Sequence, residues 1–322
     1  MLTRRDFVTG AIASGVLMSE VPTFDRKASQ PATPVNFEIP AHACDSHTHL
    51  FGDVNKFPVS PKHLYIPVPQ QPGEMSSLHH ALHMERVVIV TPTVYGPNNN
   101  GATLVGLKAR GATARGIAIV DDTTTDSDFE KLYKAGFRGA RIFAGATGPK
   151  DPSSLRPVFQ SAAARFKKHN WHIQIYSNLA VVTALKDLVA ASPVPVVFDH
   201  FGGLQAPLGL DQPGFSDLLG LVRAGSVYVK ISGAYRASSN GPDYPDVAPF
   251  AKALIAANPD RIVWGTDWPH PKTPASGAKP SDPMPMYEID DGRLLNQLPV
   301  WAPDPAVRKK ILVDNPARLY GF

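Results

Sequence analysis

The stretch Val194-Pro-Val-Val-Phe-Asp-His-Phe-Gly-Gly203 is a short apolar, β-branched run that ends in polar residues and glycines. Such a run is typical of a β-strand that is buried on both faces. The segment that follows it, residues 215–224, has the periodicity of an amphipathic helix. The same pattern recurs along the chain, and we expect eight strands at these runs: residues 43–51, 86–95, 114–121, 137–144, 171–177, 194–201, 226–234 and 261–267.

Apolar strands that alternate with helices indicate a parallel sheet covered on both faces. Helical periodicity is present between the strands, at residues 127–135, 155–169, 179–191, 215–224 and 244–257. An open, doubly wound sheet would show the same alternation. Eight successive units, and the lack of a glycine-rich phosphate turn after the first strand, favour a closed (β/α)8 TIM barrel. We therefore predict a single barrel domain over residues 41–322, with a lid-like excursion at 271–303 and a closing helix at 306–320.

Composition excludes several classes of protein. The chain has 322 residues, of which 43% are hydrophobic and 19% charged, so it can bury a large core and is not a disordered chain. A net charge of +4 without a Lys/Arg run argues against nucleic-acid binding and leaves room for a small anionic ligand. The single cysteine, Cys44, is expected to be a buried, inert thiol, so any metal must be held by His, Asp or Glu.

Residues 1–40 resemble an export signal followed by a linker. Arg4 and Arg5 precede a mildly apolar stretch, residues 8–18, that is too short to span a bilayer. This arrangement predicts a twin-arginine signal, with the twin-arginine export machinery as partner, a periplasmic location and no stable membrane insertion. The alternative is an ordinary amphipathic first helix.

Polar residues gather where the predicted strands end, which is where a parallel barrel carries its working groups. His47 and His49 are two residues apart, so on a strand both imidazoles point to the same side. His200 and Asp267 end two other strands. Three imidazoles and a carboxylate at one barrel mouth either hold a divalent ion or polarise a carbonyl while the carboxylate takes a proton from water, and the residues alone leave both open.

The remaining histidines carry weaker signals. His79, His80 and His83 lie in a polar helical stretch, which predicts a solvated surface. We expect structural roles for four others: His42, His63, His169 and His172.

The chain resembles the amidohydrolase superfamily, and within it the branch of 2-pyrone-4,6-dicarboxylate lactonase-like proteins. The resemblance extends from about residue 40 to the C-terminus, and two of its segments are specific: Trp264-Gly-Thr-Asp-Trp-Pro-His-Pro271 and Val313-Asp-Asn-Pro-Ala-Arg-Leu-Tyr320. The other segments that carry it are Asp45-Ser-His-Thr-His-Leu-Phe-Gly52, Gly139-Ala-Arg141, Trp171-His-Ile-Gln-Ile-Tyr176 and Phe198-Asp-His-Phe-Gly202. The resemblance implies an enzyme that opens a carboxylated lactone, with Asp267 as general base and His47, His49 and His200 polarising the carbonyl.

The same resemblance implies how a substrate is bound. Arg141 and Arg236 match positions that bind substrate carboxylates, and Tyr176 matches a tyrosine that contacts the substrate. Where the pyrone dicarboxylate enzyme has a further arginine, this chain has residues 144–148, Ala-Gly-Ala-Thr-Gly, which implies fewer or differently placed anionic groups on the substrate.

Metal dependence and reaction type separate the alternatives. Many relatives hold a metal through a histidine on strand 5 or a lysine on strand 4, where this chain has Tyr176 and Arg141, so we expect no obligatory metal or other cofactor. The alternatives are a zinc-dependent hydrolase or non-oxidative decarboxylase that uses His47, His49 and Asp267 as ligands, a lactone isomerase, and a catalytically silent periplasmic binding protein.

Overall fold

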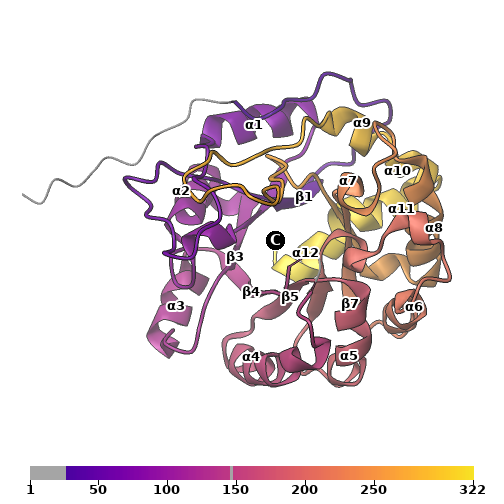
Figure 1. Ribbon diagram of the computed structural model, residues 1–322. Coiled ribbons are helices and arrows are strands. Elements are labelled where there is room, and N and C mark those ends of the chain that lie inside the picture. The colour runs from indigo at the N-terminus through magenta and orange to yellow at the C-terminus, as the bar shows by residue number, and fades with distance from the viewer. Residues whose placement is uncertain (1–26, 146–147) are drawn as a thin grey trace, which may run out of the picture.

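The computed structural model describes residues 27–145 and 148–322, which form an eight-stranded parallel barrel surrounded by helices (Figure 1). The predicted signal at residues 4–18 lies outside the described residues. Neighbouring strands pair in chain order, and all pairs are parallel. The strands are β1 Cys44–Thr48, β2 Arg86–Val90, β3 Ala114–Ala118, β4 Phe137–Phe143, β5 His172–Tyr176, β6 Val196–Phe198, β7 Val227–Ser232 and β8 Ile262–Gly265. The prediction of a (β/α)8 fold is confirmed.

Helices follow the strands, and five of them lie at the segments where periodicity predicts them, whereas those at residues 101–110 and 234–237 correspond to no predicted segment. They are α1 Pro72–Ala81, α2 Gly101–Arg110, α3 Asp126–Lys134, α4 Arg156–His169, α5 Leu179–Ala190, α6 Phe215–Arg223, α7 Ala234–Ala237 and α8 Ala248–Ala257. The chain ends with α9 Asp291–Leu295, α10 Leu298–Trp301, α11 Pro305–Lys309, a π-helical turn at Lys310–Asp314 and α12 Asn315–Tyr320. None of the helices in 27–145 and 148–322 is long and apolar enough to cross a membrane.

Strand β7 shows how the barrel separates an apolar shell from a polar interior. Val227, Val229 and Ile231 belong to the main apolar core. The alternate residues have polar side chains and form contacts inside the barrel, among them Lys230 and Ser232. Because successive side chains of a strand point to opposite faces, one strand supplies both layers.

The C-terminal residues close the barrel end opposite the site. Tyr320, the last residue of α12, is fully buried against Cys44, Val88 and Ile117. Its ring centroid lies 6.0 Å from the Lys230 ammonium. Figure 1 shows the C-terminus near the middle of the ring of strands. Cys44 is buried as predicted, and burial raises the pKa of its thiol.

Candidate active site

Asp45 closes the barrel between its first and last strands. Its carboxylate accepts hydrogen bonds from the backbone nitrogens of His47 and Thr266, at 3.1 and 3.0 Å, and from the Thr266 hydroxyl at 2.7 Å. The backbones of the two segments also bond directly, because Asp267 N donates a hydrogen bond to His47 O over 2.8 Å. A Cβ at Gly265 would lie 2.6 Å from His47 N, so glycine is needed for this approach. The seam between β1 and β8 therefore fixes the distance from the two histidines to Asp267.

Two of the predicted residues occupy strained backbone positions just after their strands. His200 has φ 49° and Asp267 has φ 66°, both in the left-handed region that non-glycine residues seldom adopt. Strain of this kind costs about 1–3 kcal/mol per residue and persists where the surrounding contacts impose it. The two strained residues lie just after β6 and β8, and their left-handed backbone turns both side chains toward the same point.

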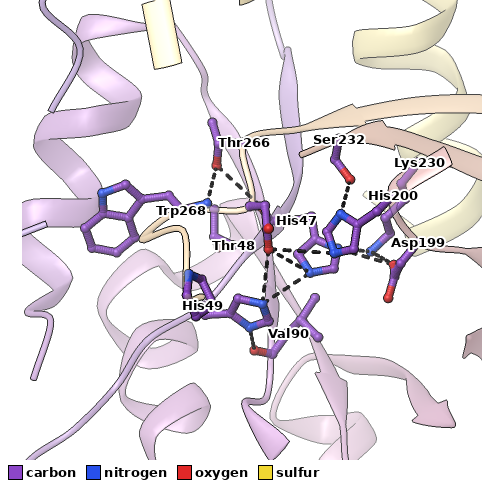
Figure 2. A network of polar contacts seen from close by, with 12 residues as sticks. His47, Thr48, His49, Val90, Asp199, His200, Lys230, Ser232, Thr266 and Trp268 are labelled. Atoms are coloured by element: carbon purple, nitrogen blue, oxygen red, sulfur yellow. Dashed lines mark hydrogen bonds and ion pairs between the residues drawn. The ribbon is translucent and has the colours of Figure 1, made fainter. Parts of the chain in front are cut away.

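Three imidazoles converge on one oxygen of Asp267. The Nε2 atoms of His49, His47 and His200 lie 3.4, 3.6 and 3.8 Å from Asp267 Oδ1. Figure 2 shows His47 between His49 and His200. Oδ1 is buried and forms no hydrogen bond with any described residue. The structure thus brings together all four residues predicted from the strand ends.

The second oxygen of Asp267 is fully engaged. Arg236 Nε donates to Oδ2 over 2.5 Å and the Tyr235 hydroxyl donates to it over 2.7 Å. Burial alone would raise the pKa of Asp267, but Arg236 and the neighbouring histidines outweigh it and hold that pKa well below its usual value. Asp267 is therefore ionised, with Oδ1 free to accept a proton.

The histidines are neutral because they are buried. Burial lowers the pKa of His200 to about 4, and it lowers the pKa of His49 despite the nearby Asp267. Burial and the adjacent Lys230 hold the pKa of His47 well below its usual value.

A buried polar layer that the sequence analysis did not assign lies beneath His47. Lys230 Nζ donates to Gln174 Oε1 over 2.7 Å and to His47 Nδ1 over 3.3 Å, and it lies 3.4 Å from Asp199 Oδ1. Arg141 Nη2 pairs with Asp199 Oδ2 at 3.0 Å. Burial lowers the pKa of Lys230 to about 8, against the opposing effect of Asp199. This layer supports the histidines from below.

A second series of buried side-chain hydrogen bonds leads away from Asp267. The Tyr235 hydroxyl lies 3.0 Å from His270 Nδ1, and His270 Nε2 lies 3.0 Å from Asp291 Oδ2. All three residues are buried. Asp291 begins α9, so the excursion after β8 is linked to the Asp267 carboxylate.

A cavity of about 370 Å³ opens above the convergent groups. His49, His200 and Asp267 lie in its wall, while His47 is fully buried and is not among the described residues that line it. The three predicted substrate residues, Arg141, Tyr176 and Arg236, also line it. Its size suits a small ligand.

The cavity wall is strongly cationic. Besides the two arginines it carries Lys62 and Lys272, and its only carboxylate among the described residues is Asp267. Arg141 Nε is buried and makes no hydrogen bond with the described residues. The arginine stacks over the Tyr176 ring at 5.0 Å.

Several lining residues come from irregular segments in which no sequence motif marks a site. Lys62, His63 and Tyr65 precede α1, and Lys272 follows β8 in the excursion predicted to be lid-like. His63 was expected to be structural, and its Nδ1 does contact the Ser60 carbonyl at 2.7 Å, yet the residue also lines the cavity.

The prediction of a solvated surface is wrong for His79 and confirmed for His80 and His83, which are exposed. His79 is 1% exposed, and its Nε2 lies 3.2 Å from Asp45 Oδ2. It shares the inner face of α1 with Met75 and Leu78, a spacing that signals burial. His79 therefore supports the carboxylate that closes the barrel.

The described donors fit a divalent ion. One ligand atom each from His47, His49 and Asp267 lies within 4.8 Å of the others, and the same holds for His47, Asp199 and His200. Imidazole and carboxylate donors in a three-residue set suit zinc. The first set is the one named from the sequence.

Comparisons with known proteins agree with this architecture. The model of the amidohydrolase family matches residues 44–322. The chain is 35% identical to a 2-pyrone-4,6-dicarboxylate hydrolase of Comamonas testosteroni, over 91% of this chain and 94% of the relative. It is 36% identical to a 4-sulfomuconolactone hydrolase of Rhizobium radiobacter, over 90% and 93% of the two chains.

Two further similarities were found. A D-galactarolactone isomerase of Agrobacterium fabrum is 32% identical over 89% of this chain and 94% of its own. An apo crystal structure of an Agrobacterium tumefaciens protein superimposes with a TM-score of 0.73 at 29% identity, covering 91% of this chain and 98% of that one.

Proposed function

Because the chain belongs to the amidohydrolase family, we propose that it is a hydrolase that opens the ring ester of a small anionic lactone. Two relatives of about one-third identity are named as hydrolases of a pyrone dicarboxylate and of a sulfomuconolactone, both anionic cyclic esters. The cationic wall of the cavity, formed by Arg141, Arg236, Lys62 and Lys272, supports the same substrate class.

The observation that carries the proposal is the free oxygen of Asp267. Oδ1 is ionised, buried and without a hydrogen-bond partner among the described residues, at the centre of three imidazoles and in the cavity wall. A water placed there would donate one proton to Oδ1 and attack the lactone carbonyl carbon. The His200 imidazole, which lines the cavity, would stabilise the resulting oxyanion.

The second half of the reaction returns the proton. Collapse of the tetrahedral intermediate breaks the ring C–O bond, and the proton held by Asp267 passes to the departing oxygen. The product is the ring-opened acid, and the Asp267 carboxylate is regenerated. Arg236 and Tyr235 keep Oδ2 occupied, so that only Oδ1 takes part.

The reaction proposed needs no metal, because Asp267 supplies the base and His200 supplies a donor at the cavity wall. If zinc is bound, His47, His49 and Asp267 would hold it, and its chemistry would be to polarise the carbonyl or acidify a water. Metal analysis of the purified protein, with assays before and after chelation, distinguishes the two. Activity that is lost on chelation and restored by zinc would contradict the metal-free proposal.

The substrate class is tested with a panel of three anionic lactones, 2-pyrone-4,6-dicarboxylate, 4-sulfomuconolactone and muconolactone, together with the neutral methyl ester of a carboxylated lactone. Ring opening is followed by absorbance and NMR. We expect turnover of at least one anionic lactone and little turnover of the neutral ester. The Asp267→Asn variant serves as the control for uncatalysed opening.

Isomerisation is the second candidate, favoured by the D-galactarolactone isomerase among the relatives. In that reaction a hydroxyl of the substrate, rather than water, would attack the carbonyl. Reaction in H₂¹⁸O separates the two, since hydrolysis places one ¹⁸O in the product carboxylate and isomerisation places none.

A further inference from the structure

Residues 28–36, which we call the N-terminal strap, run along the barrel from α1 to α9 (Figure 1). The strap contains no helix or strand, yet specific contacts hold both of its ends. Ala28 is buried in the main apolar core, and its backbone N–H donates to Gln70 Oε1 over 3.1 Å. At the other end, Asn36 N donates to Asn296 Oδ1 over 2.9 Å. A solvated linker would make no such contacts, so the strap is part of the fold.

The strap supplies the hydrogen-bond acceptor for the indole of Trp268, the residue that follows Asp267. Trp268 is fully buried, and its Nε1 donates to Ser29 O over 3.1 Å. The backbone of Trp268 belongs to the site, because its O accepts from His49 N over 2.7 Å and its N donates to the Thr266 hydroxyl over 3.0 Å (Figure 2). A buried N–H that loses its acceptor is costly, so the strap restricts where Trp268 can lie.

A second contact of the strap leads to Asp267 through α9. The carboxylate of Asp290, which caps α9, accepts a hydrogen bond from the Thr33 hydroxyl over 2.6 Å and another from Thr33 N over 3.0 Å. The next residue, Asp291, begins the series of buried hydrogen bonds that leads through Tyr235 to Asp267. The strap therefore contacts two segments that position the same carboxylate.

The strap packs on α9 so closely that the helix needs a glycine there. A Cβ at Gly292 would lie 1.9 Å from Thr33 O. Gly292 is in the first turn of α9 and outside the left-handed region, where alanine would favour the helix more than glycine does. The contact with the strap, rather than the helix, accounts for the glycine.

We propose that the N-terminal strap is a positioning segment of the active site, which holds the Trp268 segment and α9 so that Asp267 points at the cavity. No residue of the strap lines the cavity, so the strap acts through Trp268 and Asp290 and does not touch the substrate. The proposal goes beyond lactone hydrolysis and rests on that proposed function only for the role of Asp267. Processing of the amino terminus must then leave the strap in the active protein.

The first test needs no substrate and uses hydrogen–deuterium exchange followed by mass spectrometry. Gly292→Ala in the full chain places a methyl group against Thr33 O and should displace the strap. Amides of residues 266–270 and 290–296 should then exchange about tenfold faster or more, while those of β3 and β4 keep the wild-type rate. Gly220→Ala in α6 is the matched control, because a Cβ there meets nothing within 4 Å.

Unchanged exchange in residues 266–270 and 290–296 of a folded Gly292→Ala protein would overturn the proposal. An equal acceleration throughout the barrel would also overturn it, because that result is expected of a purely structural role. If Gly292→Ala does not fold, Thr33→Val replaces it, since this change removes the hydroxyl that bonds to Asp290. Thr33→Ser keeps the hydroxyl and should restore the wild-type exchange.

The second test separates positioning from substrate binding by steady-state kinetics with an anionic lactone that the protein opens. Gly292→Ala should lower kcat about ten- to a hundredfold, the range for a slightly misplaced reacting group, and leave KM within about twofold. An unchanged kcat, or a change in KM alone, would overturn the proposal. The exchange test contains no lactone, so it still decides the proposal if the proposed hydrolysis is wrong.

Discussion

Arg236 and Asp267 form a buried ion pair in which the guanidinium Nε donates to Asp267 Oδ2 over 2.5 Å. The pair orients the carboxylate, but it also lowers the pKa of Asp267 and makes it a weaker base. A substrate anion that shares the guanidinium would weaken the pair and raise that pKa. The same arginine can therefore link substrate binding to activation of the base.

Asp267→Asn keeps the size of the side chain and its hydrogen bonds with Tyr235 but removes the proton acceptor. Turnover of the anionic lactone should fall about 10²- to 10⁴-fold, the range for a lost general base. Steady-state kinetics measure this loss, and thermal denaturation checks that the fold is intact. Near-wild-type turnover would eliminate Asp267 as the base.

The two arginines should respond differently to replacement by methionine. Arg141→Met should cost about 2–4 kcal/mol in kcat/KM for charged lactones and far less for a neutral methyl ester, because this arginine lines the cavity and can pair with a substrate anion. Arg236→Met should lower turnover of both substrates, because this arginine holds Asp267. Equal losses for Arg141→Met on both substrates would assign it a structural role through Asp199.

Tyr235→Phe removes one hydrogen bond from Asp267 Oδ2 and breaks its link to His270. We expect kcat to fall about tenfold with little change in KM, since one hydrogen bond to a charged group contributes about 1.5–3 kcal/mol and Arg236 still holds the oxygen. His63→Ala, in the cavity wall, is the matched control and should affect KM instead. An unchanged kcat for Tyr235→Phe would mean that the hydroxyl is dispensable for the base.

Stability should fall as the pH drops from about 7 to 4. Burial lowers the pKa values of four histidines, His47, His49, His172 and His200, so between about pH 6.5 and 4 the unfolded chain binds more protons than the folded one. For His172 and His200, whose pKa values are lowered to about 3 and about 4, the slope is about 1.4 kcal/mol per pH unit each. Below pH 4 the depressed pKa values of Asp199 and Asp267 extend the loss.

Urea unfolding at pH 7.5 and 5.0 measures this slope. His172 lies outside the convergent groups, and its burial lowers its pKa to about 3, so His172→Leu should reduce the pH dependence by about one proton while turnover persists. Equal stability at the two pH values would contradict the argument for neutral buried histidines.

The sequence was sufficient to predict the barrel and the four convergent residues for one reason. Parallel strands place their carboxyl ends at one edge, so His47, His49, His200 and Asp267 had to lie near one another once the strands were identified. No three-dimensional information beyond that rule was needed.

Other parts of the site could not be derived in this way. Lys230 sits within an apolar strand, and which face of β7 points inward depends on the barrel register rather than on any local pattern. Lys62, Tyr65 and Lys272 lie in irregular segments whose course is set by tertiary contacts. His79 is different, since its spacing from Met75 and Leu78 on α1 contained the signal for burial.

The export signal predicted at the amino terminus stays a prediction, and it can be tested separately from the catalytic site. Twin-arginine export carries folded proteins and requires both Arg4 and Arg5. Replacing both arginines by lysine should therefore leave active enzyme in the cytoplasm, while deletion of residues 1–26 should leave activity in vitro unchanged. Cell fractionation followed by an activity assay measures both. Wild-type protein found wholly in the cytoplasm with its first residue intact would mean that this segment is not an export signal.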